Sequence, residues 1–247
     1  IQPSWDDSKI AVSLTKSDKE FSKIIIVDIK TKEVLQGVAP NSWPNSLGGI
    51  DWIPDSSGFI YTYVPDINNK SKNYLLNTKA VLFKIGKSGY TDLFSKDKNS
   101  QIPFKEEDFP IIYLNNSYDK FIIGALAGAT RYRDTYYATT DNLSTSNVRW
   151  KFLFSKEEKI DLFYVDGNDL YYKTAKNATN FKICKTSLNN PDFSNPIVLI
   201  KENKTSVITD FVIVKNGIYF IKTKNGVEAK LFHLNSGNEK EIPIPKP

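Results

Sequence analysis

The sequence predicts an all-β fold, and specifically a β-propeller made of four-stranded antiparallel blades. About every 50 residues, an aromatic residue leads through a polar turn into a short apolar strand, a period typical of repeat architectures. These five stretches begin at Trp5, Trp52, Tyr113, Phe163 and Phe211. Asn-Gly and Asp-Gly pairs between apolar runs indicate tight hairpins, and no stretch shows helical periodicity. Four strands in a unit of roughly 40 to 50 residues correspond to one propeller blade.

Each expected strand is an alternating or β-branched run bounded by turn residues. Ile10–Leu14 alternates, and Lys23–Ile29 is closed by a Lys-Thr-Lys turn. The same pattern predicts strands at Gly58–Tyr63, Lys79–Ile85, Phe121–Leu126, Thr135–Thr139, Leu170–Lys173, Asn180–Lys185, Gly217–Thr223 and Ala229–Leu234. Because one blade cannot bury both faces of its sheet, blades must stack, and we expect the leading aromatic residues to fill the space between them.

We expect residues 1–247 to form one propeller domain or a fragment of one. The expected blades cover about 1–46, 47–104, 105–156, 157–204 and 205–247. The second contains the Asn- and Lys-rich stretch Val64–Thr78, which we interpret as a solvated loop, with a flap over one end of the ring as the alternative. Gly124 and Gly128 are interpreted as sites of close backbone approach near the ring axis.

Composition excludes several classes of function. The net charge is +5, but both signs are spread along the chain without a block of five like charges, so we expect no nucleic-acid partner. No apolar run reaches the roughly 20 residues that span a membrane, and no signal peptide is visible. The single cysteine, Cys184, lies in an alternating run and is expected to be an ordinary strand residue. A cytoplasmic and a periplasmic location both remain open. The sequence lacks methionine, so we expect a mature form or an excised piece.

No catalytic or metal site can be built from these residues. There is no Gly-x-Ser-x-Gly nucleophile elbow, and Ser88 in Gly-Lys-Ser-Gly lies in an expected hairpin turn. The only histidine, His233, lies inside an expected strand and is interpreted as a packing or surface residue. The acidic run Glu106–Asp108 could attract calcium, although we favour simple solvation because no EF-hand spacing is present. We expect no cofactor and no metal.

Motifs in three of the expected blades point to a known family. The first is Ser4-Trp-Asp-Asp-Ser-Lys-Ile-Ala-Val-Ser-Leu14, and the most specific is Trp52-Ile-Pro-Asp-Ser-Ser-Gly-Phe-Ile-Tyr61. The third is Tyr172-Lys-Thr-Ala-Lys-Asn-Ala-Thr-Asn-Phe-Lys-Ile183. In order and content they resemble the propeller domain of prolyl oligopeptidase, a serine peptidase. Lys84 stands where the family usually has histidine, and five blades are expected here against the family's seven.

The resemblance implies a role in substrate gating. The family hydrolyses short peptides after proline with a Ser-Asp-His triad on an α/β-hydrolase domain, which this sequence lacks. The chain alone is therefore expected to be inactive, with the hydrolase domain of the same parent chain and short peptides as partners. The resemblance places Lys176 where a family arginine reaches substrate, although an exposed hairpin lysine is an equal alternative. Arg131 and Arg133 are expected to face the tunnel or the hydrolase, or else to pair with Asp134.

Two other functions stay open at this stage. A stand-alone propeller of the TolB or WD40-like kind, which binds a protein partner, shares the Trp-x-x-Asp-x-x-Gly pattern. A five-bladed glycosidase would need paired inward carboxylates, for which Asp6, Asp55 and Asp119 are weak candidates because they occupy turns. If flanking blades are missing, the two end blades expose apolar faces, which predicts a dimer through them.

Overall fold

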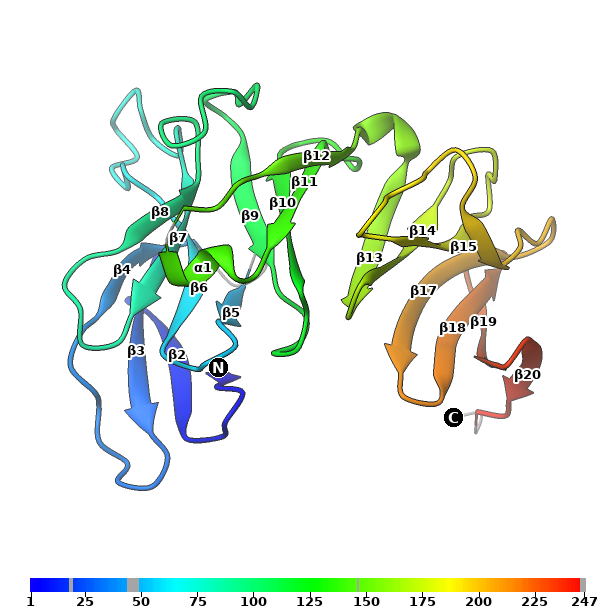
Figure 1. Ribbon diagram of the computed structural model, residues 1–247, viewed down its shortest axis with the longest axis horizontal. Coiled ribbons are helices and arrows are strands. Elements are labelled where there is room, and N and C mark those ends of the chain that lie inside the picture. Colours follow the sequence, from blue (N-terminus) through cyan, green and yellow to red (C-terminus); the bar gives the residue numbers. More distant parts are fainter. Residues whose placement is uncertain (18–19, 44–48, 146, 245–247) are drawn as a thin grey trace. The chain divides into compact units, whose positions relative to one another are not determined.

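The structure, a computed structural model, describes residues 1–17, 20–43, 49–145 and 147–244 (Figure 1). The predicted boundary between the first two blades, at residues 46 and 47, lies outside these ranges. The chain divides into two compact units, Ile1–Leu153 and Phe154–Pro247, which are described separately. In the described parts, strands dominate, and the helical segments are the single turns α1 (Asn142–Thr145) and η1 (Lys156–Glu158). Four residues are too few for α1 to show periodicity in the sequence.

The first unit contains three groups of four antiparallel strands. The first two groups share one sheet, because Ser42 of β4 bridges to Tyr63 of β6. The third group forms its own sheet in the order β12-β11-β10-β9. The strands are β1 (Gln2–Pro3), β2 (Lys9–Thr15), β3 (Ser22–Asp28), β4 (Ala39–Ser42), β5 (Ile50–Trp52), β6 (Gly58–Tyr63), β7 (Lys79–Lys84), β8 (Thr91–Phe94), β9 (Phe109–Tyr113), β10 (Phe121–Ala127), β11 (Thr135–Thr139) and β12 (Lys151–Phe154).

The second unit contains two four-stranded antiparallel sheets whose strands pair in chain order. The strands are β13 (Ile160–Asp166), β14 (Asp169–Thr174), β15 (Lys182–Ser187), β16 (Ile197–Ile200), β17 (Val207–Val214), β18 (Gly217–Lys224), β19 (Glu228–Asn235) and β20 (Asn238–Ile242). The first hairpin turns at Gly167, whose φ of 62° is a left-handed conformation that glycine adopts without a steric penalty. The predicted all-β fold of four-stranded antiparallel sheets is confirmed.

Successive side chains of the central strands pack against different neighbours. In β6, Phe59 and Tyr61 share an apolar cluster with Ile24 of β3, whereas Ile60, on the other face, packs in a cluster with Ile112 of β9. Side chains of a strand alternate between the two faces of its sheet, so a strand that is covered on both faces is apolar at nearly every position. This explains the uninterrupted apolar run of β6, in which five consecutive residues are buried.

The aromatic residues that lead the repeats contribute unequally to these cores. Trp52 and Phe211 are fully buried in apolar clusters, whereas Trp5 keeps 37% of its surface exposed. Trp5 nevertheless links two groups of strands, because its indole Nε1 donates to the carbonyl oxygen of Trp52 over 2.7 Å. The Trp52 indole donates in return to the carbonyl of Gln2 over 3.0 Å. The reciprocal pair joins the start of the chain to β5.

The two glycines interpreted as close backbone approaches differ from each other. A Cβ added to Gly124 would lie 2.8 Å from Cζ3 of Trp150, so the crowding comes from an aromatic core between sheets. At Gly128 an added Cβ would meet nothing within 4 Å, and the interpretation is wrong there. Spacing in the sequence cannot separate the two cases, because Trp150, which crowds Gly124, lies 26 positions further along the chain (150 − 124 = 26).

The stretch Val64–Thr78 contains neither helix nor strand, as predicted for a loop. Several hydrogen bonds hold it: the Tyr74 hydroxyl donates to Glu20 over 2.8 Å, and the Asn77 backbone N–H donates to the carbonyl of Glu106 over 2.7 Å. These contacts attach the loop to neighbouring segments of the first unit. Its role as a flap stays a prediction.

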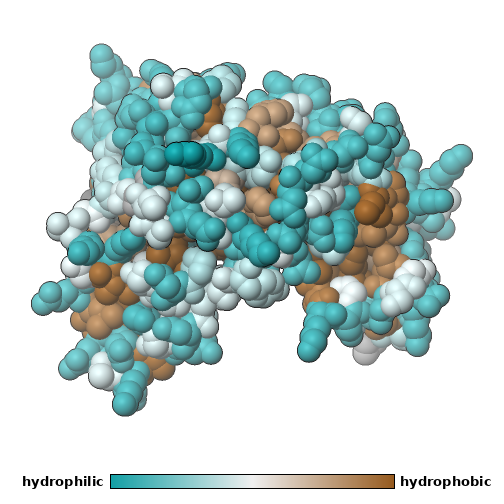
Figure 2. Space-filling view, viewed as in Figure 1, coloured by the Kyte–Doolittle hydropathy of each residue, from teal (hydrophilic) through white to brown (hydrophobic). Residues whose placement is uncertain are grey.

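One face of the first sheet and one face of the last are apolar and partly exposed. On the first, Ile10 pairs with Val27 and Val12 with Ile25, and Leu14 is 49% exposed. On the last, Val212 is 43% exposed and lies opposite Tyr219. Figure 2 shows apolar surface over β2 and β3 and, separately, over the C-terminal sheet. The opposite faces of the same sheets are buried in apolar clusters.

Candidate functional site

Lys176 lies in the turn after β14, in the second unit. Its ammonium Nζ lies 2.5 Å from Oε1 of Glu158, whose side chain is largely buried. Its backbone N–H donates to the Thr174 hydroxyl over 2.9 Å, which fixes the turn. The positive charge is thus already engaged, and a substrate anion would have to compete with Glu158. A substrate-facing role for Lys176 stays a prediction.

Arg131 and Arg133 lie in the segment between β10 and β11 of the first unit, and they point to different surroundings. Arg131 is exposed, with its guanidinium carbon 5.7 Å from the centre of the Tyr132 ring. Arg133 is partly buried, and its Nη1 donates to the Tyr113 hydroxyl over 2.9 Å. The Nε of Arg133 is buried and has no hydrogen-bond partner. Of the two, Arg133 is the residue held against a neighbouring strand.

Arg133, Tyr113 and Asp51 form what we call the inner-strand cluster. Asp51 lies on β5 and Tyr113 on β9; each strand pairs on one side only and begins its group of four. Burial raises the pKa of Asp51 to about 8. Burial also raises the pKa of Tyr113, and the Arg133 guanidinium opposes that rise. At neutral pH the cluster therefore offers a neutral carboxyl, a phenol and a guanidinium, which can bind an acceptor group but include no nucleophile–base pair.

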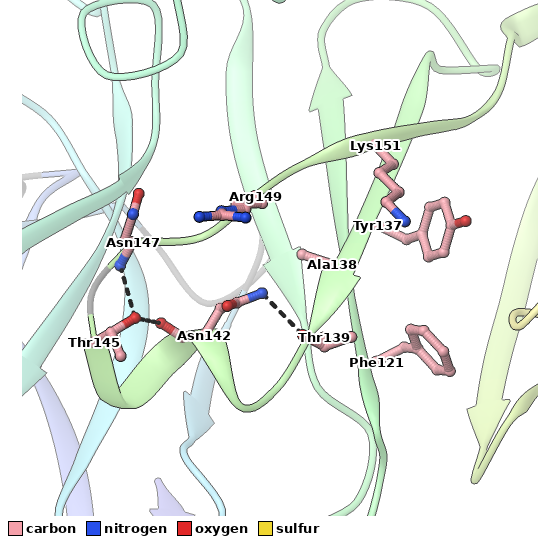
Figure 3. A pocket seen from close by; sticks show the side chains of 9 residues that line it. All are labelled: Phe121, Tyr137, Ala138, Thr139, Asn142, Thr145, Asn147, Arg149 and Lys151. Carbon is pink, nitrogen blue, oxygen red and sulfur yellow. Dashed lines mark hydrogen bonds between the residues drawn. The ribbon is translucent and has the colours of Figure 1, made fainter.

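A hollow of about 540 Å³ lies beside the β9–β12 sheet, between the segment that leads into β12 and the helical turn α1 (Figure 3). We call it the basic pocket. Its charged side chains are Arg149 and Lys151, and Asn142 and Asn147 supply amides. Two rings, Phe121 and Tyr137, lie 5.9 Å apart at one side. The sequence prediction did not include these residues; the available signal was the pair of cations on one face of the strand pattern Arg149-Trp-Lys151.

Of the residues considered for nucleophile or base roles, His233 is engaged in contacts and Cys184 is buried. The His233 ring stacks on Tyr219 at 4.3 Å, and its Nε2 lies 2.9 Å from the carbonyl oxygen of Asn216. Cys184 is buried, and burial raises the pKa of its thiol to about 11, which disfavours the reactive thiolate. In the acidic run, Glu106 pairs with Lys96 at 3.0 Å. Asp108 accepts the backbone N–H of Lys105 at 2.7 Å.

Two features are absent from the described residues. No group of three or more His, Cys, Asp or Glu side chains in them could hold a metal ion. None of the helices in those same ranges has the length and apolar character needed to cross a membrane.

The family described as "Prolyl oligopeptidase, N-terminal beta-propeller domain" matches residues 1–247. The chain belongs to this family. The match covers the first and second units alike and agrees with the motifs at Ser4–Leu14 and Trp52–Tyr61.

Curated relatives and solved structures agree with the family. A prolyl endopeptidase of Elizabethkingia miricola is 24% identical over 186 residues, which cover 74% of this chain and 24% of that protein. A structure from a study of two prolyl endopeptidases matches 99% of this chain and 35% of its own, with a TM-score of 0.82 and 14% identity. A structure of prolyl oligopeptidase B from Galerina marginata, bound to a 25mer macrocyclization substrate, matches 98% of this chain and 34% of its own. Its TM-score is 0.80 and its sequence identity is 15%. The chain thus spans about a quarter of the first of these relatives and about a third of these structures.

Proposed function

We propose that this chain is the substrate-gating propeller of a prolyl oligopeptidase-like serine peptidase that cleaves short peptides after proline. The family match over residues 1–247 carries the proposal. The proposal also explains why a chain related to peptidases has a single histidine, already stacked on Tyr219, since the triad would lie on an α/β-hydrolase domain of the same parent protein.

Within this proposal the inner-strand cluster faces the passage through which peptides enter. Arg133 is its best candidate for peptide contact, because it is the only member that carries a positive charge and its Nε has no partner. Arg131, which is exposed in the same segment, and Lys176, which would have to leave Glu158, are weaker candidates. A propeller in this role selects peptide substrates by their size and takes no part in the cleavage reaction.

The test is peptide hydrolysis by the full-length protein that contains this chain. A short proline-containing peptide should be cleaved, and the same sequence inside a long or folded polypeptide should resist cleavage. The chain alone should release no product from either substrate. Hydrolysis by the chain alone, or equal rates for short and long substrates, would overturn the proposal. Coding sequence around this segment without a hydrolase domain would instead favour a stand-alone binding module.

The apolar faces of the first and last sheets raise the separate proposal of a dimer through these faces. Leu14 is 49% exposed and Val212 is 43% exposed, and burying such side chains against a second copy would favour the dimer. Light scattering on the size-fractionated chain measures its mass directly. If the mass at high concentration is that of a monomer, and Leu14→Asp and Val212→Asp leave this mass unchanged, the dimer is excluded.

A further inference from the structure

The basic pocket contains two cations without an acidic partner. Among the described residues, neither Arg149 nor Lys151 makes an ion pair, although pairs such as Lys79 with Asp97 occur elsewhere in the same unit. Both side chains are exposed, and both border the hollow. Both positive charges border the same hollow, so an anion bound in it would be attracted by both.

The other walls of the pocket have a different chemistry. Figure 3 shows Asn142 rising from α1 toward the space below Arg149; at the far side, Tyr137 lies beside Lys151 and Phe121 lies below them. The Asn142 amide is held in place because its Nδ2 donates to the Thr139 hydroxyl over 2.8 Å. Its carbonyl oxygen remains available as an acceptor. The pocket thus combines cations, amide groups and an aromatic wall.

The volume of the pocket and its combination of chemical groups restrict the class of ligand that it can bind. A hollow of about 540 Å³ falls within the range of small-molecule sites, roughly 300 to 1,000 Å³. A guanidinium binds a carboxylate through two parallel hydrogen bonds, and an asparagine amide matches the donors and acceptors of a peptide bond. The half-buried Tyr137 ring, backed by the buried Phe121 ring, offers a surface for an apolar or aromatic side chain.

We propose that the basic pocket binds the C-terminal residue of a peptide whose last side chain is apolar or aromatic. Arg149 holds the terminal carboxylate, and the charge of Lys151 at the other end of the hollow also attracts it. Asn142 contacts the last peptide bond, and the Tyr137 ring, backed by the buried Phe121 ring, contacts the side chain. The choice of a peptide as ligand rests on the proposed function.

The test is a binding titration of the full chain, followed by NMR, with acetyl-Ala-Ala-Phe as the free acid and as the C-terminal amide. The free acid should bind at least tenfold more tightly, because the amide removes the charge that the two cations recognise. Arg149→Gln and Lys151→Gln should each weaken binding of the free acid about tenfold. Lys87→Gln, which removes an exposed charge from a hairpin turn of the same unit, should leave the affinity unchanged.

Three results would overturn the proposal: no binding of the free acid, equal binding of acid and amide, or full affinity in the Arg149→Gln and Lys151→Gln variants. All replaced side chains are exposed, so the variants should fold, and far-UV circular dichroism checks this. A failure here is distinct from a failure of the gating function. Discrimination between short and long substrates by the full-length protein does not depend on the pocket.

Discussion

Replacing Gly124 by alanine should destabilise the first unit, because the new methyl group has no room. Its Cβ would lie 2.8 Å from Cζ3 of Trp150 and 3.1 Å from Cε1 of Phe94. The Trp150 ring cannot easily retreat: its Nε1 donates to the carbonyl of Leu93 over 3.0 Å, and its ring lies 4.5 Å from that of Phe94. Both rings are buried. The strand or the two rings must therefore shift.

The magnitude follows from two opposing effects. Overpacking a well-filled core costs about 1–3 kcal/mol. Alanine also restricts the unfolded chain relative to glycine, which stabilises by about 0.4–1 kcal/mol where the backbone conformation allows it. We expect Gly124→Ala to lower the free energy of unfolding by about 1–2 kcal/mol. Gly128→Ala is the matched control, because nothing lies within 4 Å of its Cβ. It should be neutral or slightly stabilising.

Urea unfolding followed by tryptophan fluorescence measures this difference in the correct part of the chain. All four tryptophans, at positions 5, 43, 52 and 150, lie in the first unit. Trp150 is also the residue that the new methyl group would displace, so its emission should shift in the folded state. If Gly124→Ala proves as stable as Gly128→Ala, the aromatic core is looser than the contacts indicate and the reasoning fails.

Three further changes test other contacts. Lys173→Met should lower the free energy of unfolding by about 3–5 kcal/mol, because it removes the cation that lies 3.5 Å from the largely buried Asp161. Urea unfolding followed by far-UV circular dichroism measures this loss, and adding Asp161→Asn should recover part of it. The pKa of Asp51 is raised by burial from 3.8 to about 8, so the unfolded state loses its proton first and stability should fall as pH rises through this window. Asp51→Asn should remove that slope in thermal melts between these pH values, and an unchanged slope would exclude Asp51 as its source. Trp5→Phe should cost about 0.5–1.5 kcal/mol by losing the hydrogen bond to the Trp52 carbonyl, and an unchanged urea midpoint would show that water replaces it fully.

The fold could be predicted because its signals are local. Hairpin turns such as Asp166-Gly167 and alternating runs are encoded within a few neighbouring residues, so the predicted run Ile10–Leu14 differs from β2 (Lys9–Thr15) by one residue at each end. The predicted strand Asn180–Lys185 begins two residues before β15 (Lys182–Ser187). Phe181 has a left-handed backbone conformation (φ 66°), which belongs to the turn, so the strand begins only after it.

The candidate sites could be predicted only in part, because they depend on contacts between distant segments. Arg133 was singled out by its charge, but its contact with Tyr113 joins residues of different strands. Asp51 has a visible signal, a carboxylate between the apolar residues Ile50 and Trp52, whose significance appears only once burial is known. The basic pocket needs α1, a turn of four residues that no periodicity can indicate.

The alternation of β6 side chains between two apolar clusters has a consequence for synthesis on the ribosome. Strands of one group are consecutive in the sequence, so each sheet can form its hydrogen bonds as soon as it has emerged. The apolar face that carries Ile60, however, is covered only after β9 has followed. Until β9 has emerged, the growing chain therefore presents a finished group of strands with an open apolar face, the surface on which a nascent-chain chaperone would act or aggregation would begin.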